Sequence, residues 1–440
     1  MNLVYGVKDK PTFGKLLVFA MQQLLAILAA TIAVPAIIGN EMSHSAALFG
    51  AGIGTIVYLL FTKFKSPVFL GSSFAFIGSM FAAFAGGVSL SAGYAGLILG
   101  AVFAGLVYVV LAIVVKIAGV KWINKLMPPV VIGPTVALIG LSLAGAAIND
   151  LQVGKVLVEG VSVASPYVCI ICGLATLAVV IICSVYGKKM SKLIPFIIGI
   201  SSGYALAAIF TLIGICTSNQ ALMVIDFSAF SNMKWYPDFT FIQAIKGVRE
   251  IDASYVATIA VAYIPVAFVV FAEHIADHKN LSSIIGVELL EEPGLHRTLL
   301  GDGIGSMAGA FFGGCPNTTY GESVGCVAIT GNASVITILT TSIIAIIASF
   351  IAPFVTFLAT IPNCVMGGVC ISLYGFIAVS GLKMIQKVDL GENKNLFVVA
   401  VILITGIGGL TLTFGQITIT SIACALILGI LTNILVSKAK

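Results

Sequence analysis

Charged residues are scarce in this chain. Only 9% of its 440 residues are Asp, Glu, Lys or Arg, whereas 59% are hydrophobic. An ordinary soluble domain is about 25% charged. So few polar groups could not cover the surface of a water-soluble protein of this size. The composition therefore excludes a soluble globular protein and predicts one whose surface faces lipid.

The sequence also shows no pattern of a cleavable leader and no long polar region. Residues 1–13 are short and polar, and the apolar stretch that begins at Gly14 is too long for the apolar part of a signal peptide. The one sizeable polar stretch, 216–250, is too short for a soluble catalytic domain. We therefore expect a multi-pass protein of the cell membrane that is not an enzyme.

Metal-binding side chains are few. The nine cysteines lie mostly in apolar stretches, which is typical of packing residues. His274 with His278, or Glu273 with Asp277, has the helical spacing of a metal pair, but the flanking sequence is not rich in His or Cys. We predict neither a metal nor a cofactor.

Apolar segments long enough to cross a bilayer, about 20 residues each, fill most of the chain. We count fourteen and expect an all-α polytopic membrane protein. They lie near 14–38, 45–62, 67–86, 93–118, 128–147, 166–186, 193–215, 253–277, 297–314, 316–331, 334–359, 362–382, 394–412 and 415–436.

The positive charges are distributed very unevenly between the ends of these segments. If both termini are cytoplasmic, the inner side carries 18 of the 22 Lys and Arg residues, namely Lys8, Lys10, Lys15, Lys63, Lys65, Lys116, Lys121, Lys125, Lys188, Lys189, Lys192, Lys279, Arg297, Lys383, Lys387, Lys394, Lys438 and Lys440. The outer side carries Lys155, Lys234, Lys246 and Arg249. Cytoplasmic loops favour positive charge, so the net charge of +5 reflects orientation and does not indicate a nucleic-acid partner.

Fourteen segments divide into two sets of seven. Residues 1–215 and 251–440 would form the two halves, with 216–250 as an extracytoplasmic loop. With an odd number of segments per half, the two halves have opposite orientations in the membrane. This predicts inverted repeats of the kind common in secondary transporters. The spacing Pro-x-x-Val-x-Gly, which begins segment five at Pro128 and segment twelve at Pro362, supports this division.

Segments three and ten look interrupted. Residues 66–76 and 315–325 place Pro, Gly, Ser and Thr where a continuous helix would favour Leu. Non-helical backbone at membrane depth survives only inside protein or beside a cavity. Interrupted segments at equivalent places in two halves therefore indicate a binding site, although two kinked helices with packing glycines would give the same pattern.

Four acidic residues lie at membrane depth. They are Glu273 and Asp277 in segment eight, Asp302 in segment nine and Glu322 in segment ten. Intramembrane carboxylates usually face an interior cavity and act there. A buried carboxyl group can take up and release a proton, which is what a proton-coupled carrier requires. For Asp302, a structural hydrogen bond to neighbouring backbone is an equally good interpretation.

Glu322 has the best position of the four. It follows the break in segment ten, where a short helix would direct free backbone N–H groups into the cavity. Phe74, Phe76 and Tyr320 offer faces for a flat ring. This chemistry suits a small neutral heterocycle with N–H and C=O groups.

The remaining histidines give weaker signals. Lys279 and Asn280 follow His278 directly, which suggests that this histidine lies at the cytoplasmic end of its segment. His44 and His296 look like loop residues.

At these residues the chain resembles the nucleobase–ascorbate transporter family, in particular its uracil permease branch. The resemblance covers nearly the whole chain and rests on five motifs: Gln22–Thr31 (QQLLAILAAT), Gly71–Phe76 (GSSFAF), Ala272–His274 (AEH), Glu292–Arg297 (EPGLHR) and Pro316–Glu322 (PNTTYGE).

The resemblance implies a core domain from segments 1–4 and 8–11, and a gate domain from segments 5–7 and 12–14 that commonly forms a homodimer. It implies short strands in segments three and ten. Glu273 and Glu322 would bind uracil or a related nucleobase, the backbone near Phe74 and Gly321 would assist, and Ala30 and Tyr320 would line the pocket. Proton coupling would involve Glu273, Asp277, Asp302 and Glu322.

One departure leaves the substrate open between uracil and a purine such as xanthine. Uracil carriers of this family can have a histidine one turn after the segment-eight glutamate, where this chain has Asp277. Purine-transporting relatives tend to have an acid there and one in segment nine, like Asp302. They usually have Gln-Asn in place of Gly321-Glu322, so segment ten favours uracil. A channel or an anion exchanger on the same plan is a third possibility, disfavoured by four buried acids.

Overall fold

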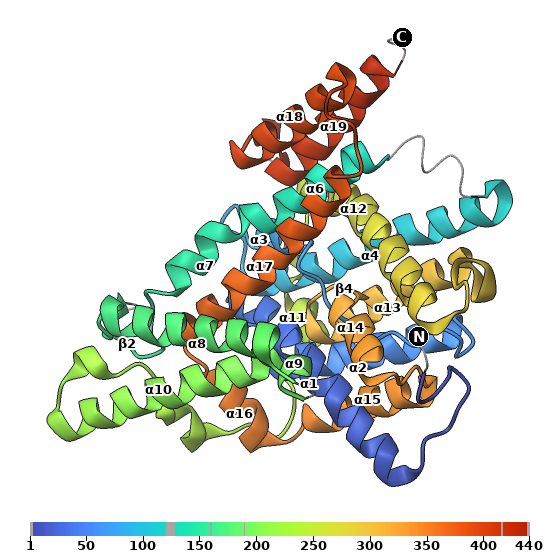
Figure 1. Ribbon diagram of the computed structural model, residues 1–440. Helices are drawn as coiled ribbons and strands as arrows, with labels where there is room; N and C mark the ends of the chain where they lie inside the picture. Colours follow the sequence, from blue (N-terminus) through green and yellow to red (C-terminus); the bar gives the residue numbers. More distant parts are fainter. Residues whose placement is uncertain (1–2, 120–127, 159–160, 189, 415–416, 438–440) are drawn as a thin grey trace.

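The computed structural model describes residues 3–119, 128–158, 161–188, 190–414 and 417–437 (Figure 1). Helices dominate it, and their bounds are α1 Phe13–Ile38, α2 His44–Phe61, α3 Ile77–Ala83, α4 Leu90–Ala118, α6 Pro129–Ser142, α7 Ala144–Asp150, α8 Pro166–Tyr186, α9 Met190–Leu193, α10 Pro195–Thr217, α11 Thr240–Gly247, α12 Ala253–Ile285, α13 Leu295–Gly313, α14 Gly321–Thr330, α15 Val335–Ala348, α16 Ala352–Thr360, α17 Asn363–Ile385, α18 Asn393–Ile407 and α19 Ser421–Val436.

Six short strands form three antiparallel pairs. They are β1 Leu70–Ser72 with β4 Asn317–Thr319, β2 Leu157–Val158 with β3 Val161–Ser162, and β5 Leu412–Phe414 with β6 Ile417–Ile419. Five of the expected cytoplasmic lysines lie outside the described residues: Lys121, Lys125, Lys189, Lys438 and Lys440.

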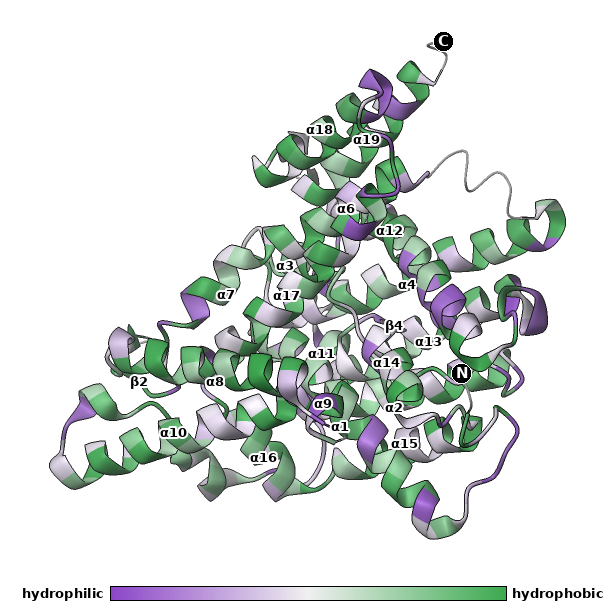
Figure 2. Cartoon of the chain, in the orientation of Figure 1, coloured by the Kyte–Doolittle hydropathy of each residue, from purple (hydrophilic) through white to green (hydrophobic). Residues whose placement is uncertain are grey.

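The expectation of a helical, multi-pass membrane protein is confirmed. In the described part of the chain, eight helices are long and apolar enough to cross a membrane, or nine if the bent pair α15 and α16 is one span. Helices α18 and α19, at 15 and 16 residues, are shorter than a typical span. Figure 2 shows hydrophobic residues along the long helices, with hydrophilic ones gathered at their ends and in loops. The number fourteen and the inverted repeats stay predictions.

Several expected boundaries were wrong. The stretch 334–359 is bent by 84° between α15 and α16, because Pro353 lies in the first turn of α16 and cannot continue the preceding helix. Helix α12 continues to Ile285 and so runs past Lys279 and Asn280.

His44 and His296 are not loop residues, since His44 lies in the first turn of α2 and His296 in the first turn of α13. The polar stretch 216–250 contains α11, which packs on α4 and α13.

The helices pack in two sets. In one, α13 packs against α2 and α4, α15 against α1 and α2, and α12 against α4, α3 and α14. In the other, α17 packs against α6, α7 and α8, α8 against α10, and α18 against α6 and α19. These sets contain the helices of the expected core and gate, and their action as separate domains stays a prediction.

Glycines let α13 approach α2 closely. Gly301, Gly305, Gly309 and Gly313 recur at every fourth residue of α13, a spacing that brings membrane helices together. A Cβ atom at Gly305 would lie 2.7 Å from the carbonyl oxygen of Gly54 on α2, and one at Gly313 would lie 2.6 Å from the carbonyl oxygen of Ala46. The obstacle is backbone, which cannot move aside as a side chain could.

We therefore expect Gly305→Ala to lower the free energy of unfolding by about 1–3 kcal/mol through overpacking. Thermal unfolding of the purified protein in detergent measures this effect. Gly375→Ala on α17 is the matched control, because a Cβ there meets nothing within 4 Å. Equal melting temperatures for the two variants would contradict this account of the α2–α13 contact.

Candidate functional site

Segments three and ten meet as two short strands. Strands β1 and β4 pair antiparallel, with Leu70 opposite Thr319, Gly71 opposite Thr318 and Ser72 opposite Asn317. Each strand leads to a short helix, α3 after β1 and α14 after β4. The pairing satisfies backbone groups that no helix satisfies here, which interior non-helical backbone requires. The strands expected in these two segments are present.

Tyr320 lies directly over β1. Its hydroxyl donates a hydrogen bond to the carbonyl oxygen of Ser72 at 2.9 Å. A Cβ at Gly71 would overlap its ring, so only glycine fits at that position. The Tyr320 N–H also donates to the carbonyl oxygen of Phe69 at 3.2 Å. The residue just before α14 is thus held to β1 by both its backbone and its side chain.

A cavity of about 390 Å³ opens beside the strands, between the two helix sets. One wall comes from the segment after β1 and from α12, β4 and α14, with Phe74, Ala75, Glu273, Ala276, Asp277, Thr318, Thr319, Tyr320, Gly321 and Glu322. The other wall comes from α6, α10 and α17, with Val136, Ile139, Phe196, Leu373, Phe376, Ile377, Ser380 and Met384. The first wall is polar, and the second is apolar except for Ser380.

Most of the predicted site residues line this cavity. Phe74, Glu273, Tyr320, Gly321 and Glu322 do so, as does Asp277. The exceptions share deep burial: Ala30 is 1% exposed and Asp302 is 1% exposed, and neither is among the lining residues. Phe76 also lies elsewhere, with its ring stacked on Tyr263 at a centroid distance of 5.5 Å.

Two threonines of β4 complete the polar wall. Thr319 Oγ1 donates a hydrogen bond to Asp277 Oδ2 at 2.8 Å and so orients that carboxylate. Thr318 Oγ1 has no partner among the described residues, although it is buried against the cavity. Sequence reasoning missed both as site residues. Their position in the Pro-Asn-Thr-Thr break was the available signal.

Hydrogen bonds to Ser323, the residue after Glu322, hold the start of α14 in place. The Ser323 hydroxyl accepts hydrogen bonds from the Gln23 side chain of α1 and from the Phe69 N–H, the latter at 3.0 Å. The first N–H groups of any helix lack intrahelical acceptors and carry partial positive charge. The Gly321–Glu322 turn therefore presents donors close to carboxylate acceptors, which together can bind a solute with both kinds of polar group.

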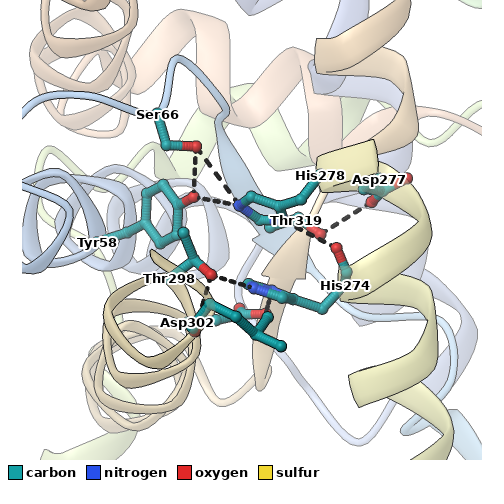
Figure 3. Close-up of polar contacts among 9 residues, drawn as sticks. Tyr58, Ser66, His274, Asp277, His278, Thr298, Asp302 and Thr319 are labelled. Carbon is teal, nitrogen blue, oxygen red and sulfur yellow. Dashed lines mark hydrogen bonds and ion pairs between the residues drawn. The ribbon is translucent and has the colours of Figure 1, made fainter. Parts of the chain in front are cut away.

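Behind the polar wall lies a second, fully buried cluster (Figure 3). His274 Nδ1 lies 2.6 Å from Asp302 Oδ2, and His274 Nε2 lies 2.9 Å from Thr298 Oγ1. Thr298 donates its own hydroxyl proton to the Leu295 carbonyl, so it accepts from Nε2–H. A single proton then lies between His274 and Asp302. One interpretation of the sequence gave Asp302 a hydrogen bond to neighbouring backbone. That interpretation was wrong for Oδ2, which hydrogen-bonds to the His274 side chain.

His278 was expected at the end of its segment, but α12 continues beyond it to Ile285. His278 is 1% exposed, and its Nδ1 donates to the His274 carbonyl at 2.8 Å. Its Nε2 hydrogen-bonds with the Tyr58 hydroxyl at 2.6 Å, and Tyr58 in turn contacts Ser66 at 2.7 Å. Both histidine rings are thus committed to protein partners, with centroids 4.0 Å apart. In the described part of the chain, no three His, Cys, Asp or Glu side chains gather as a metal site.

Comparison with known proteins decides the family. A model of the Permease family matches residues 14–415. The chain belongs to this family, the nucleobase–ascorbate transporters. The resemblance read from the five motifs is thereby confirmed.

Relatives of this permease match along nearly its whole length. The uracil permease of Bacillus caldolyticus is 39% identical over 440 residues, covering 98% of this chain and 94% of the relative. The uracil permease of Bacillus subtilis is 36% identical, covering 99% and 95%. These relatives are named permeases, which are transport proteins and not enzymes.

Solved structures share the fold at low sequence identity. The transmembrane domain of the cyanobacterial bicarbonate transporter BicA has a TM-score of 0.63 and 15% identity, covering 95% of this chain and 96% of that one. The murine anion transporter Slc26a9 has a TM-score of 0.66 and 12% identity, covering 98% and 69%. The permease thus has the fold of these transporters, which by itself says nothing about its cargo.

Proposed function

We propose that this permease imports uracil by proton symport with alternating access. The observation that carries the proposal is the polar wall, where Glu273 and Glu322 line the cavity beside the N-terminus of α14. Relatives named uracil permease, at 36–39% identity over nearly the full length, support the same substrate. The cavity volume lies within the range of small-molecule pockets, about 300–1,000 Å³.

The chemistry of uracil matches this wall group by group. Uracil has two ring N–H donors and two carbonyl acceptors on a flat ring. Carboxylates of Glu273 and Glu322 would accept from the N–H groups, while the backbone at Gly321 would donate to a carbonyl. Phe74 and Tyr320 supply aromatic surface beside them.

Acidic residues that share one small space support proton coupling. Glu273, Asp277 and Glu322 all line the cavity, so each can exchange a proton with its contents. Asp302 sits behind them in a pair with His274 that holds one proton. In this proposal the proton and uracil enter together, both termini are cytoplasmic, and the second helix set (α6, α7, α8, α10, α17, α18 and α19) forms the moving gate and a homodimer contact.

A purine such as xanthine is the second candidate, favoured by the acid at Asp277 and by Asp302. An anion is disfavoured, because within the described residues no Lys, Arg or His lines the cavity. Binding competition separates the bases. If uracil is the cargo, it displaces labelled uracil at much lower concentration than xanthine does, whereas the reverse order would support the purine.

Uptake by proteoliposomes tests the transport proposal directly. With an inward proton gradient, labelled uracil should accumulate above its outside concentration, and a protonophore should abolish that accumulation. A sodium gradient without a proton gradient is the control. Accumulation that survives the protonophore but requires sodium would show that the coupling ion has been assigned wrongly.

A further inference from the structure

A small cavity lies beside Asp302, the residue that pairs with His274. Its volume is about 10 Å³, close to the space of one water molecule. It lies where α4, α12, α13 and β4 meet, and its lining includes Tyr108, Asp302, Ser306 and Asn317. It is separate from the large cavity, with which it shares no lining residue.

Three polar atoms of this lining have no hydrogen-bond partner among the described residues: Asp302 Oδ1, Tyr108 OH and Ser306 Oγ. All three side chains are at most 5% exposed. Asp302 uses its other oxygen, Oδ2, for the bond to His274 (Figure 3). Buried polar groups are nearly always hydrogen-bonded, and three orphans around one small space is an uncommon concentration.

We propose that this cavity holds one tightly bound water molecule, hydrogen-bonded to Asp302, Tyr108 and Ser306. Internal waters typically make about three hydrogen bonds to otherwise unpaired buried groups. The surroundings explain why a side chain does not fill the space. Gly105 and Gly303 bring α4 and α13 into backbone contact here, since a Cβ at Gly105 would lie 2.8 Å from the carbonyl oxygen of Gly303.

The water has a place in the wider hydrogen-bond network. It joins the His274–Asp302 pair of α12 and α13 to Tyr108 of α4, and it lies against Asn317, the first residue of β4. Asn317 itself donates to the Gly50 carbonyl of α2 at 3.1 Å. The bound water therefore lies between the His274–Asp302 pair and β4, the strand that lines the large cavity. This inference does not depend on which molecule is transported.

X-ray radiolytic hydroxyl labelling of the purified full-length protein in water containing ¹⁸O tests the proposal. Radicals formed from a bound internal water modify the side chain beside it even when bulk solvent cannot reach it. We expect Tyr108 to be modified and Tyr263 to stay unmodified. Tyr263 is the control, because it is 0% exposed against 4% for Tyr108 and its hydroxyl also lacks a partner among the described residues, yet it does not line this cavity.

Ala104→Ser gives a second arm, since Ala104 lines the same cavity and its new hydroxyl would take the place of the water. In the folded variant the labelling of Tyr108 should be lost. An unmodified Tyr108 in the unaltered protein would overturn the proposal whether or not the variant folds. Labelling that persists in a folded variant would overturn it too. Labelling that disappears when sodium replaces choline in the buffer would assign the cavity to a monovalent cation and not to water.

Discussion

Glu322→Gln is expected to weaken uracil binding by at least about 100-fold. This is the scale expected when one hydrogen bond to a charged group is lost and a buried donor is left unpaired. The carboxylate offers only acceptors, whereas the amide would place an N–H against a ring N–H of uracil. Calorimetric titration of purified protein with uracil measures the loss, and thermal unfolding shows that the fold is kept.

Glu250→Gln makes the same chemical change at an exposed position outside the cavity and should leave uracil binding unaltered. Glu322→Asp keeps the charge but shortens the side chain by one methylene. Its affinity for uracil should therefore lie between those of Glu322→Gln and Glu250→Gln. Undiminished uracil affinity in Glu322→Gln would remove this residue from the binding site, whatever the cargo.

Asp302→Ala is expected to destabilise the protein by about 3 kcal/mol and to stop transport. The substitution leaves His274 Nδ1 without its partner at a position that is 0% exposed. Leaving a buried hydrogen-bonding group without its partner costs about 1–3 kcal/mol, and the space left by the side chain adds to that cost. The melting temperature in detergent and the yield of monodisperse protein report this loss.

Asp302→Asn separates structure from proton coupling. The carboxamide can keep a hydrogen bond to His274, so stability should largely recover, but it cannot exchange a proton. If Asp302 serves coupling, uracil still exchanges across the membrane while accumulation driven by a proton gradient is lost. Full gradient-driven accumulation in Asp302→Asn would leave Asp302 with a structural role alone.

The sequence was most informative where chemistry conflicts with the bilayer. Glu273, Asp277 and Glu322 stand out because ionisable groups are costly in lipid, and all three line one cavity. The interruptions that hold β1 and β4 could be expected because Pro316 and Gly71 lie in otherwise apolar segments, whereas the strands themselves were implied by the family resemblance. In each case a local pattern carried the information.

Features that depend on distant contacts could not be predicted. His278 looked like a residue at a membrane surface because Lys279 follows it, yet Tyr58 and Ser66, more than 200 residues away in sequence, bury it. The bond between Asp302 and His274 likewise requires knowing how α12 and α13 cross. The bend before α16 had a signal in Pro353, but proline is common enough in membrane helices that it does not specify an 84° turn.

The two walls of the large cavity differ in a way that bears on how such permeases diverge. Nearly all of the hydrogen-bonding groups belong to the wall of α12, β4 and α14, while the wall of α6, α10 and α17 offers van der Waals contact. An apolar surface discriminates poorly among flat rings of similar size. We expect changes at Leu373 or Ile377 to alter how quickly the walls part, without altering which base is held. If the walls part during transport, as proposed, turnover and selectivity depend on different surfaces, and a substitution can change one without the other.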